Sequence, residues 1–394
     1  MDIGPLHASK SESLGVSVKI LTICGTRPEA IKLAPLVHAF REAPDVEHVL
    51  CSTGQHRQML DQVLEIFGLR ADHDLNLMRP GQNLTYVTAA ALEGVGSVID
   101  RENPDWVVVQ GDTTTAFAGA LAAFYRKVRV AHVEAGLRTG NIYSPWPEEM
   151  NRKLVGALST LHFPPTELSA DNLRREGVDN DAISVTGNTV IDALRWMDAR
   201  LAADAPFRTR AEEAFAAQLD TGRRVMLVTG HRRENFDGGL ANVARALRAI
   251  ADRGDVEIVY PVHLNPQVQA IANEILGNHP RIHLIAPLDY APFVALMRRS
   301  YLIVTDSGGV QEEAPTLGRP VLVTRDTTER PEAIAAGTGR LVGTDANALV
   351  AAVTELLDDA SAYARMAHAQ NPFGDGHASE RILKRLRQIS DRGN

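Results

Sequence analysis

The sequence predicts an α/β protein with two doubly wound parallel sheets, one following the other along 394 residues. Short apolar runs alternate with helix-length segments from residue 18 onward, which is the pattern of repeated strand-helix-strand units. The alternation stops between Val190 and Gly222, a stretch rich in Ala, Arg and Asp, and it restarts at Val225. Because helices cover both faces of a parallel sheet, its strands are expected to be apolar throughout.

In the first half, five apolar runs predict buried strands, and helical spacing between them predicts the crossovers. The strands are expected at Val18–Cys24, His48–Ser52, Trp106–Gln110, Arg129–Val133 and Ile183–Thr186. The helices are expected at Ala30–Arg41, Arg57–Phe67, Leu84–Arg101 and Thr114–Tyr125. Residues 18–187 are therefore predicted to form an N-terminal domain. Residues 1–17 lack the apolar segment of a secretory signal and are interpreted as a disordered extension.

In the second half, a helical connector is followed by a second set of apolar runs. The strands are expected at Val225–Val228, Glu257–Pro261, Ile282–Ile285, Leu302–Thr305 and Val321–Thr324. Residues 188–371 are predicted to form this C-terminal domain. The tail has helical spacing, and residues 372–394 are expected to return and pack against the first domain.

Composition narrows the class of function. A net charge of −8 argues against general nucleic-acid binding. No apolar run reaches the roughly 18 residues of a membrane helix, so we expect a cytoplasmic protein without membrane contact. The two cysteines, Cys24 and Cys51, lie in apolar runs and are interpreted as buried free thiols. No histidine pair at metal spacing accompanies the candidate carboxylates, and we therefore expect no metal.

Ligands of such sheets bind at the carboxyl ends of the strands, and polar residues follow the predicted strands of the first domain. Arg27 and Lys32 could face an anion beside a helix N-terminus, or be solvated cations next to an ordinary cap. Asp112, Glu134 and Glu148 are candidates for proton transfer, because carboxylates gathered in one cleft raise one another's pKa. Asp112 could instead cap a helix and Glu148 complement a helix dipole. Glu134 has no such alternative role.

The second domain offers candidate phosphate ligands. His231, with Arg232 beside it, follows the first strand and could bind a phosphate or protonate a departing one, although a lone histidine is usually structural. Ser307-Gly308-Gly309 follows a buried strand and opens a helix, which lets a phosphate approach backbone N–H groups, or it is a simple turn. Glu313 could accept hydrogen bonds from ribose hydroxyls, and Arg330 adds a cation on a loop.

Seven separated motifs resemble the bacterial non-hydrolysing UDP-N-acetylglucosamine (UDP-GlcNAc) 2-epimerases, in order, from about Val18 to Arg387. The motifs are Gly25–Ala30, Gly111–Thr115, His132–Gly140, Pro145–Glu149, Thr186–Asp192, Gly230–Glu234 and Asp306–Gly309. The resemblance implies a GT-B-type fold, in which two Rossmann-like domains enclose an interdomain active site and the C-terminal one binds UDP. It also implies a homodimer, no external cofactor, and interconversion of UDP-GlcNAc and UDP-ManNAc for cell-surface polysaccharide synthesis.

The resemblance also implies roles for individual residues. The active-site set would be Arg27, Lys32, Asp112, Glu134, Glu148 and His231. The UDP-binding set would be Phe293, Ser307, Gly308, Gly309, Glu313 and Arg330. Leu288 departs from the family pattern, which has Gln near the uracil, so only a backbone contact would survive there.

Some family members are activated by UDP-GlcNAc at a second, adjacent site. The residues that resemble this site are Gln55, Gln58, Glu148, Arg232 and His263. Gly81 stands where some relatives have Arg, which weakens the case for activation in this chain.

The mechanism that the resemblance implies is elimination followed by re-addition. A base removes the C2 proton while UDP leaves C1, giving 2-acetamidoglucal, and UDP returns after the proton has been replaced on the other face. Carboxylates would handle the proton, cations would hold the diphosphate, and His231 would assist UDP departure. Three alternatives remain: a GT-B glycosyltransferase using a UDP-sugar, a catalytically silent nucleotide-sugar sensor, and a hydrolysing epimerase that releases free ManNAc. Incubation with UDP-GlcNAc alone distinguishes them.

Overall fold

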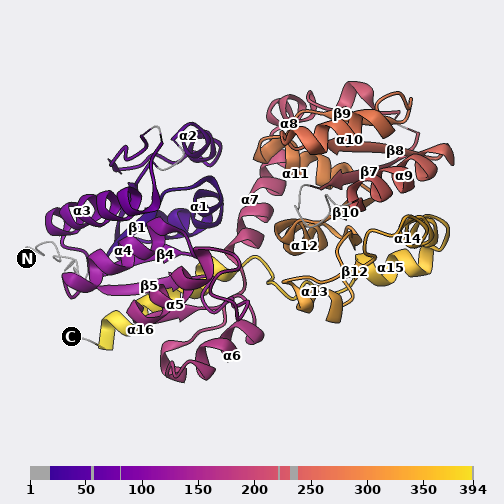
Figure 1. Ribbon diagram of the computed structural model, residues 1–394. Coiled ribbons are helices and arrows are strands. Elements are labelled where there is room, and N and C mark those ends of the chain that lie inside the picture. The colour runs from indigo at the N-terminus through magenta and orange to yellow at the C-terminus, as the bar shows by residue number, and fades with distance from the viewer. Residues whose placement is uncertain (1–17, 55–56, 80, 221, 231–237, 393–394) are drawn as a thin grey trace, which may run out of the picture.

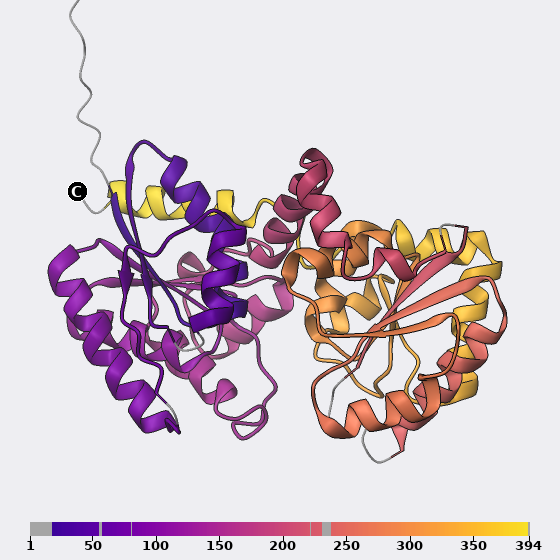
Figure 2. The same cartoon turned by 90° about the horizontal axis from the view of Figure 1, so that it is seen from above.

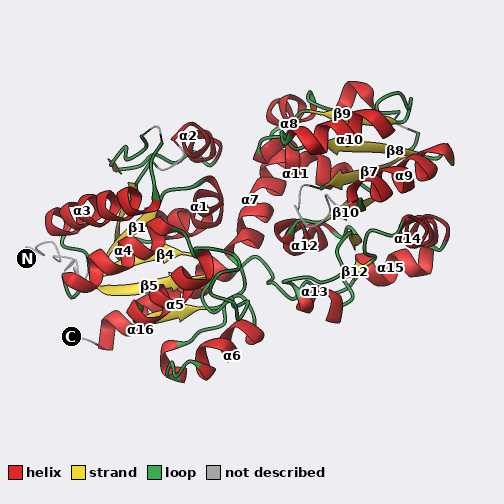
Figure 3. Ribbon diagram, viewed as in Figure 1, coloured by secondary structure: helices red, strands yellow, loops and turns green. Residues whose placement is uncertain are grey.

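Two six-stranded parallel sheets form the framework of the molecule (Figures 1 and 3). The computed structural model describes residues 18–54, 57–79, 81–220, 222–230 and 238–392. The strand orders are β3-β2-β1-β4-β5-β6 and β12-β11-β10-β7-β8-β9, so both sheets are doubly wound. The strand order reverses between β1 and β4 in the first sheet and between β7 and β10 in the second, and crevices for ligands form at such positions.

The first sheet contains the strands expected from the apolar runs, with one exception. Its strands are β1 Val18–Cys24, β2 Val46–Ser52, β3 His73–Asp74, β4 Trp106–Gln110, β5 Arg129–Val133 and β6 Leu161–Phe163. Its helices are α1 Arg27–Glu42, α2 Arg57–Ile66, α3 Leu84–Glu102, α4 Thr114–Tyr125, α5 Glu148–Leu158 and α6 Glu167–Arg175.

The prediction of a strand at Ile183–Thr186 was wrong, because the outer position of the sheet belongs to β6. Ile183 makes only an isolated parallel bridge to His162. Ser184 and Thr186 donate backbone hydrogen bonds to the β6 segment, yet they add no further ladder pairs. The segment therefore runs along β6 as an irregular edge and not as a strand of its own.

The second sheet repeats the design of the first. Its strands are β7 Arg224–Thr229, β8 Val256–Pro261, β9 Ile282–Ile285, β10 Leu302–Thr305, β11 Val321–Val323 and β12 Gly339–Leu341. Its helices are α9 Gly239–Asp252, α10 Pro266–Leu276, α11 Tyr290–Arg299, α12 Gly308–Glu313, α13 Pro331–Ala335, α14 Ala346–Asp358 and α15 Ala360–Ala367. The sequence did not indicate β12, since a three-residue edge strand that contains Gly and Arg is no apolar run.

Three further helices connect the two halves. α7 Thr189–Ala203 and α8 Ala205–Glu212 form the connector, and α7 lies between the halves, in contact with α1 and α11 (Figure 1). α16 Ala378–Arg392 returns to the first half, where it packs against α1 and α7 (Figure 2). The Trp106 indole N–H donates to Ser390 Oγ at 3.0 Å and ties α16 to β4. The domain limits at 187/188 and 371/372 stay a prediction.

A large apolar cluster among the described residues crosses from one half to the other. It includes Leu33 of α1, Leu194 of α7, Leu296 of α11 and Ile303 of β10, all buried. Because burial of apolar surface stabilises such contacts, the relative position of the halves is set by packing and not only by the connecting chain. In the described part of the chain, no helix combines the length and the apolar character needed to cross a membrane.

Candidate active site

The turn after β1 is fixed by a buried carboxylate. Glu29 accepts hydrogen bonds from the backbone N–H groups of Gly25 and Thr26, at 3.1 and 2.8 Å, in a capping box that starts α1. Thr113 Oγ donates to the same carboxylate at 2.6 Å, which joins this turn to the loop after β4. Glu29 is thus a structural residue, and it sets the start of the helix on which Lys32 lies.

Glu134 occupies the centre of the site, at the end of β5. Both oxygens of its carboxylate lie close to Lys32 Nζ, at 2.6 and 2.8 Å. Gln110 donates to one oxygen, and Asn188 Nδ2 donates to the other at 2.8 Å. Its backbone has a φ of +61°, a left-handed conformation that costs a non-glycine residue roughly 1–2 kcal/mol. A buried, strained residue with this many charged and polar partners is typical of a functional site.

The charge state of Glu134 follows from these partners. Burial by itself would raise the pKa of the carboxyl group, but the charge and hydrogen bond of Lys32, with the charge of Arg330, lower the pKa below its usual value. For Lys32, burial disfavours the charged form, but the Glu134 and Glu312 carboxylates raise its pKa overall. Both groups are therefore charged at neutral pH.

Residues of the second half complete this arrangement. Glu312 accepts from the same Asn188 nitrogen at 3.0 Å, and Arg330 Nε donates to Glu312. We call Lys32, Glu134, Asn188, Glu312 and Arg330 the interlobe cluster. Its two cations balance its two carboxylates, which is what buried charges require. The cluster brings the predicted residues Lys32, Glu134 and Arg330 together.

Sequence reasoning missed two members of the interlobe cluster. Asn188 belongs to one of the seven motifs and caps a helix, so it received no chemical role. Glu312 directly precedes Glu313, and only the latter was selected. The available signal was the run of polar residues Gln311-Glu312-Glu313. All three are buried, in the last part of the six-residue helix α12.

The turn Ser307-Gly308-Gly309, which is the candidate phosphate-binding turn, lies next to the interlobe cluster. Ser307 is the N-cap of α12 and makes no side-chain capping bond, and Gly308 and Gly309 form the first residues of the helix. A Cβ atom on Gly308 would approach the Arg330 guanidinium at 3.9 Å, and one on Gly309 would approach Glu313 Oε2 at 3.7 Å. The structure thus brings Ser307, Gly308, Gly309, Glu313 and Arg330 to one place.

Glu313 has an unusual electrostatic position. Burial, together with the negative charge of Glu312, raises the pKa of Glu313 to about 8. The Tyr290 hydroxyl faces this carboxyl group and partly offsets the rise in pKa, and no other described residue forms a hydrogen bond with the buried Oε1 atom. A buried acceptor without a partner costs free energy, and a ligand hydroxyl would satisfy it. This geometry suits the predicted contact with a ribose.

Arg27 and Phe293 lie at the junction of the halves. The Arg27 guanidinium reaches across to the loop before α11, where it donates to the Leu288 carbonyl at 3.5 Å and lies 4.0 Å from Asp289 Oδ1. Phe293 and Leu288 are partly buried and pack against the apolar cluster that crosses the halves. Arg27 therefore contacts the second half, as a residue in an interdomain site should.

Asp112 is not a helix cap, since Thr113 is the N-cap of α4. Asp112 Oδ2 instead pairs with Arg152 of α5, at 2.7 and 2.8 Å from two guanidinium nitrogens. Arg152 also donates to the fully buried Glu149, which accepts from the backbone of the loop at residues 139 and 140. Asp112 is therefore held near the start of α5 as a carboxylate beside a cation.

Glu148 opens α5 and is half-buried. Its Oε2 atom is buried without a hydrogen-bond partner among the described residues. Among the described residues, no hydrogen bond or ion pair joins Asp112 or Glu148 to the interlobe cluster. A Cβ on Gly111, next to Asp112, would nevertheless lie 3.5 Å from Glu134 Oε2. A cavity of about 380 Å³ lies between the loop before α5 and the loop before α13. The cavity is lined by Thr139, Asn141, Ser144, Pro145, Arg325, Thr327, Thr328 and Glu329.

Some predicted residues are not placed by the structure. Gln55, His231 and Arg232 lie outside the described residues, as does the side chain of Gln58. His263 is exposed, and its Nδ1 accepts from the Asn265 backbone at 3.1 Å before α10. The roles of these residues stay predictions. Within the described ranges, no group of three or more His, Cys, Asp or Glu side chains could hold a metal ion.

The molecule has one doubly wound sheet in each half and a candidate site between the two halves. This arrangement places the chain in the GT-B-type class of α/β proteins. A family model described as UDP-N-acetylglucosamine 2-epimerase matches residues 38–387. A UDP-N-acetylglucosamine 2-epimerase of Yersinia pestis is 55% identical over 371 residues, which cover 94% of this chain and 98% of the relative. The chain belongs to the UDP-N-acetylglucosamine 2-epimerase family.

Two solved structures extend the comparison. The UDP-GlcNAc 2-epimerase of Neisseria meningitidis bound to UDP-GlcNAc is 46% identical, with a TM-score of 0.85, and the match covers 94% of this chain and 100% of that one. The Methanocaldococcus jannaschii UDP-GlcNAc 2-epimerase, in complex with UDP-GlcNAc and UDP, is 34% identical with a TM-score of 0.76. That match also covers 94% of this chain and 100% of the other.

Proposed function

We propose that this protein is a non-hydrolysing UDP-GlcNAc 2-epimerase, which interconverts UDP-GlcNAc and UDP-ManNAc by elimination of UDP and its re-addition. The observation that carries the proposal is the position of Glu134, a buried carboxylate held between two cations where the halves meet. Membership of the family and the ligands named for related structures support the same reading. The reaction would supply a nucleotide sugar for cell-surface polysaccharide synthesis.

The residue types match the chemical difficulty of the reaction. The C2 proton has no adjacent carbonyl to acidify it, so its removal must accompany departure of UDP from C1. Glu134 is anionic and therefore suited to act as a base, while Lys32 and Arg330 can stabilise the charge of the departing diphosphate. A bound diphosphate that contacts Lys32 and Arg330 would reduce their stabilisation of the Glu134 anion. The pKa of Glu134 would then rise, and Glu134 would become a stronger base. Substrate binding would in this way activate the base.

The other candidates complete the proposed site. We assign Asp112 and Glu148 to the same proton-handling group as Glu134, and His231 to the departure of UDP. Arg27, Phe293, Ser307, Gly308, Gly309 and Glu313 would hold the nucleotide. Two features stay proposals from the family resemblance: a homodimer, and a second UDP-GlcNAc site that uses Gln55, Gln58, Arg232 and His263.

Product analysis after incubation with UDP-GlcNAc alone tests this function. A non-hydrolysing epimerase forms UDP-ManNAc until equilibrium, with nucleotide sugar conserved. A hydrolysing enzyme releases UDP and free ManNAc in equal amounts. A glycosyltransferase needs an acceptor for sugar transfer and forms no UDP-ManNAc. A silent sensor binds UDP-GlcNAc and leaves it unchanged. Any of these three outcomes would contradict the proposal.

We expect UDP binding to depend on pH through the Glu313 carboxyl group. In the free protein its pKa is raised to about 8, so at pH 7 it is mostly protonated. Ribose hydroxyls that donate to the carboxylate would favour the deprotonated form, and binding should therefore release a proton. Affinity for UDP should rise with pH by up to about tenfold per unit, and level off above pH 8.

Isothermal titration in buffers of different ionisation enthalpy measures the proton released. Phosphate groups of UDP titrate in the same range, so the comparison is with Glu313→Gln, in which the carboxyl contribution is absent and the phosphate contribution remains. Identical pH profiles for the two proteins would show that Glu313 does not bind the nucleotide as a carboxylate.

A further inference from the structure

Two segments of chain cross between the halves, and they touch each other. One segment leads into α7 at Gly187-Asn188, and the other leads into α16 at Phe373-Gly374. The Asn188 backbone N–H donates to the Phe373 carbonyl at 2.7 Å. A Cβ atom on Gly187 would lie only 3.1 Å from Gly374 Cα, so the two backbones are in close contact. Any rotation of one half against the other must bend or shift this crossing.

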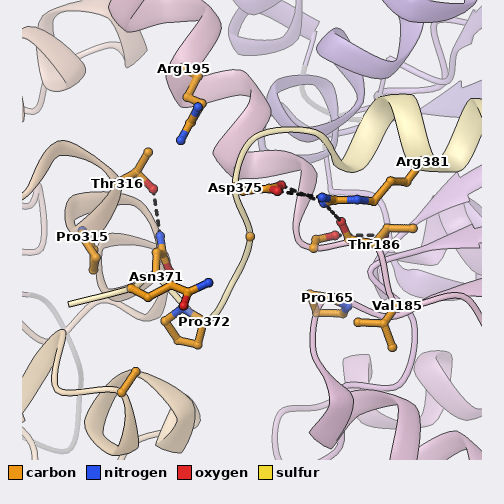
Figure 4. A pocket seen from close by; sticks show the side chains of 14 residues that line it. Pro165, Val185, Thr186, Arg195, Pro315, Thr316, Asn371, Pro372, Asp375 and Arg381 are labelled. Atoms are coloured by element: carbon orange, nitrogen blue, oxygen red, sulfur yellow. Dashed lines mark hydrogen bonds and ion pairs between the residues drawn. The ribbon is translucent and has the colours of Figure 1, made fainter. Parts of the chain in front are cut away.

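The crossing borders a hollow on one side. A pocket of about 730 Å³ lies there, lined by residues of both halves, including Thr186, Thr316 and Asn371 (Figure 4). Figure 4 shows the segment that carries Asp375 passing over this space toward α16. Because close packing resists movement and open space does not, the crossing has room to move on this side. A change in the angle between the halves would be taken up here, and we call this crossing the hinge.

Both polar atoms of the Asn188 side chain have partners, one at the start of α7 beside the hinge and the other in the interlobe cluster. Its Oδ1 accepts from the Val190 N–H at 3.1 Å and caps α7. Its Nδ2 donates to Glu134 at 2.8 Å and to Glu312 at 3.0 Å. Two carboxylates can be faced only by the amide NH₂ group, which has two hydrogens, so the orientation of the side chain follows from the chemistry. Asn188 is 2% exposed, and its contacts are therefore shielded from water.

We propose that Asn188 is a positioning residue, which transmits the geometry of the hinge to the Glu134 carboxylate. It moves with the crossing through Phe373, and it holds Glu134 and Glu312, one from each half, at a common donor. Closure of the halves thus brings the carboxylate to its working position and keeps it charged. The proposal rests on the proposed function, because it requires that Glu134 handles the C2 proton.

Replacement by serine separates the two tasks of Asn188. Serine can still cap α7 as an acceptor, but its hydroxyl is too short to replace the NH₂ group between two carboxylates. For Asn188→Ser we expect kcat to fall about 10- to 100-fold, with KM for UDP-GlcNAc changed less than about threefold, as for an interaction made in the chemical step. Loss of a donor to the charged form raises the pKa of Glu134, so the acidic limb of the kcat profile should move to higher pH.

Two further variants make the test decisive. Asn188→Asp also keeps the cap but places a third carboxylate in the cluster, so its kcat should fall further and its acidic limb should move further up in pH. Asp345→Ala is the control for cap loss, since Asp345 caps α14 through Ala348 N at 2.8 Å and has no part in the proposed site. It should lower the melting temperature and leave kcat and the pH profile unchanged.

The outcomes separate this proposal from the proposed function. If the natural protein forms no UDP-ManNAc, the function is wrong and the positioning role falls with it. If the natural protein is active, and the Asn188→Ser variant folds and has the same kcat and pH profile as the natural protein, only the positioning role is wrong. The same holds if Asn188→Ser loses activity solely in proportion to its fraction unfolded, as a structural residue would. If the serine variant does not fold, the aspartate variant decides by the same criteria.

Discussion

Glu134→Gln is expected to lower the rate of epimerisation by about 10²- to 10⁴-fold while UDP still binds, because the variant keeps the size of the side chain and cannot carry a proton. The variant leaves the Lys32 ammonium without its carboxylate partner, so stability should also fall, and turnover and binding are compared on the folded protein. Turnover is followed by formation of UDP-ManNAc and binding by titration with UDP. Washout of C2 deuterium from labelled UDP-GlcNAc should slow in parallel.

Glu257→Gln is the matched control for this variant. Glu257 is another carboxylate buried at a sheet, 3% exposed, and it pairs with Arg223 and His283. Its replacement should reduce stability without a change in kcat. If Glu134→Gln turns over at the natural rate, Glu134 is a structural residue. If epimerisation falls while C2 exchange continues normally, Glu134 acts on the opposite face of the sugar.

Lys32→Met should have the largest effect on stability, as well as abolishing most activity. It leaves Glu134 buried with neutral donors in place of its nearest cation, and breaking a buried pair in this way costs about 3–5 kcal/mol. In the variant the pKa of Glu134 is no longer held down by Lys32. Stability should therefore be better preserved at low pH, where the carboxyl is protonated, and should decline as the pH rises through the new pKa.

The double variant Lys32→Met/Glu134→Gln distinguishes charge imbalance from lost packing. Removing both charges should restore much of the stability lost in Lys32→Met and none of the activity. Urea unfolding of the natural protein, both single variants and the double variant gives the coupling energy of the pair. Additive losses of stability, with no recovery in the double variant, would mean that the two side chains contribute independently.

The apolar runs predicted most of the fold, because a strand that is buried on both faces of the sheet has apolar residues along its whole length. α4 was predicted with its observed bounds, Thr114–Tyr125, since its start is marked by polar threonines and its body is apolar. β12 was not predicted, for the opposite reason, and the irregular edge at Ile183–Thr186 was wrongly predicted as a strand. A strand at the rim of a sheet is short and only partly buried, so its sequence differs little from that of a loop.

The candidate site was predictable only in part. Glu134 could be selected because a carboxylate at the end of an apolar strand has no local partner. The roles of Asn188 and Glu312 depend on each other across 124 residues, and neither pattern nor spacing records that contact. The raised pKa of Glu313 arises first from its burial, which only the folded structure shows, and then from the charge of its neighbour Glu312. Local chemistry can be predicted from sequence, whereas shared partners require the fold.

Proton NMR of UDP-GlcNAc incubated with the protein in D₂O tests the central claim most directly. If Glu134 and its partners remove and replace the C2 proton, signals of UDP-ManNAc should appear, and the H2 signals of both sugars should disappear as deuterium enters from the solvent. The Glu134→Gln variant should slow both changes. Formation of UDP-ManNAc with H2 fully retained would contradict the account, because the C2 proton would then never exchange with the solvent. A complete absence of UDP-ManNAc would contradict the proposed function itself.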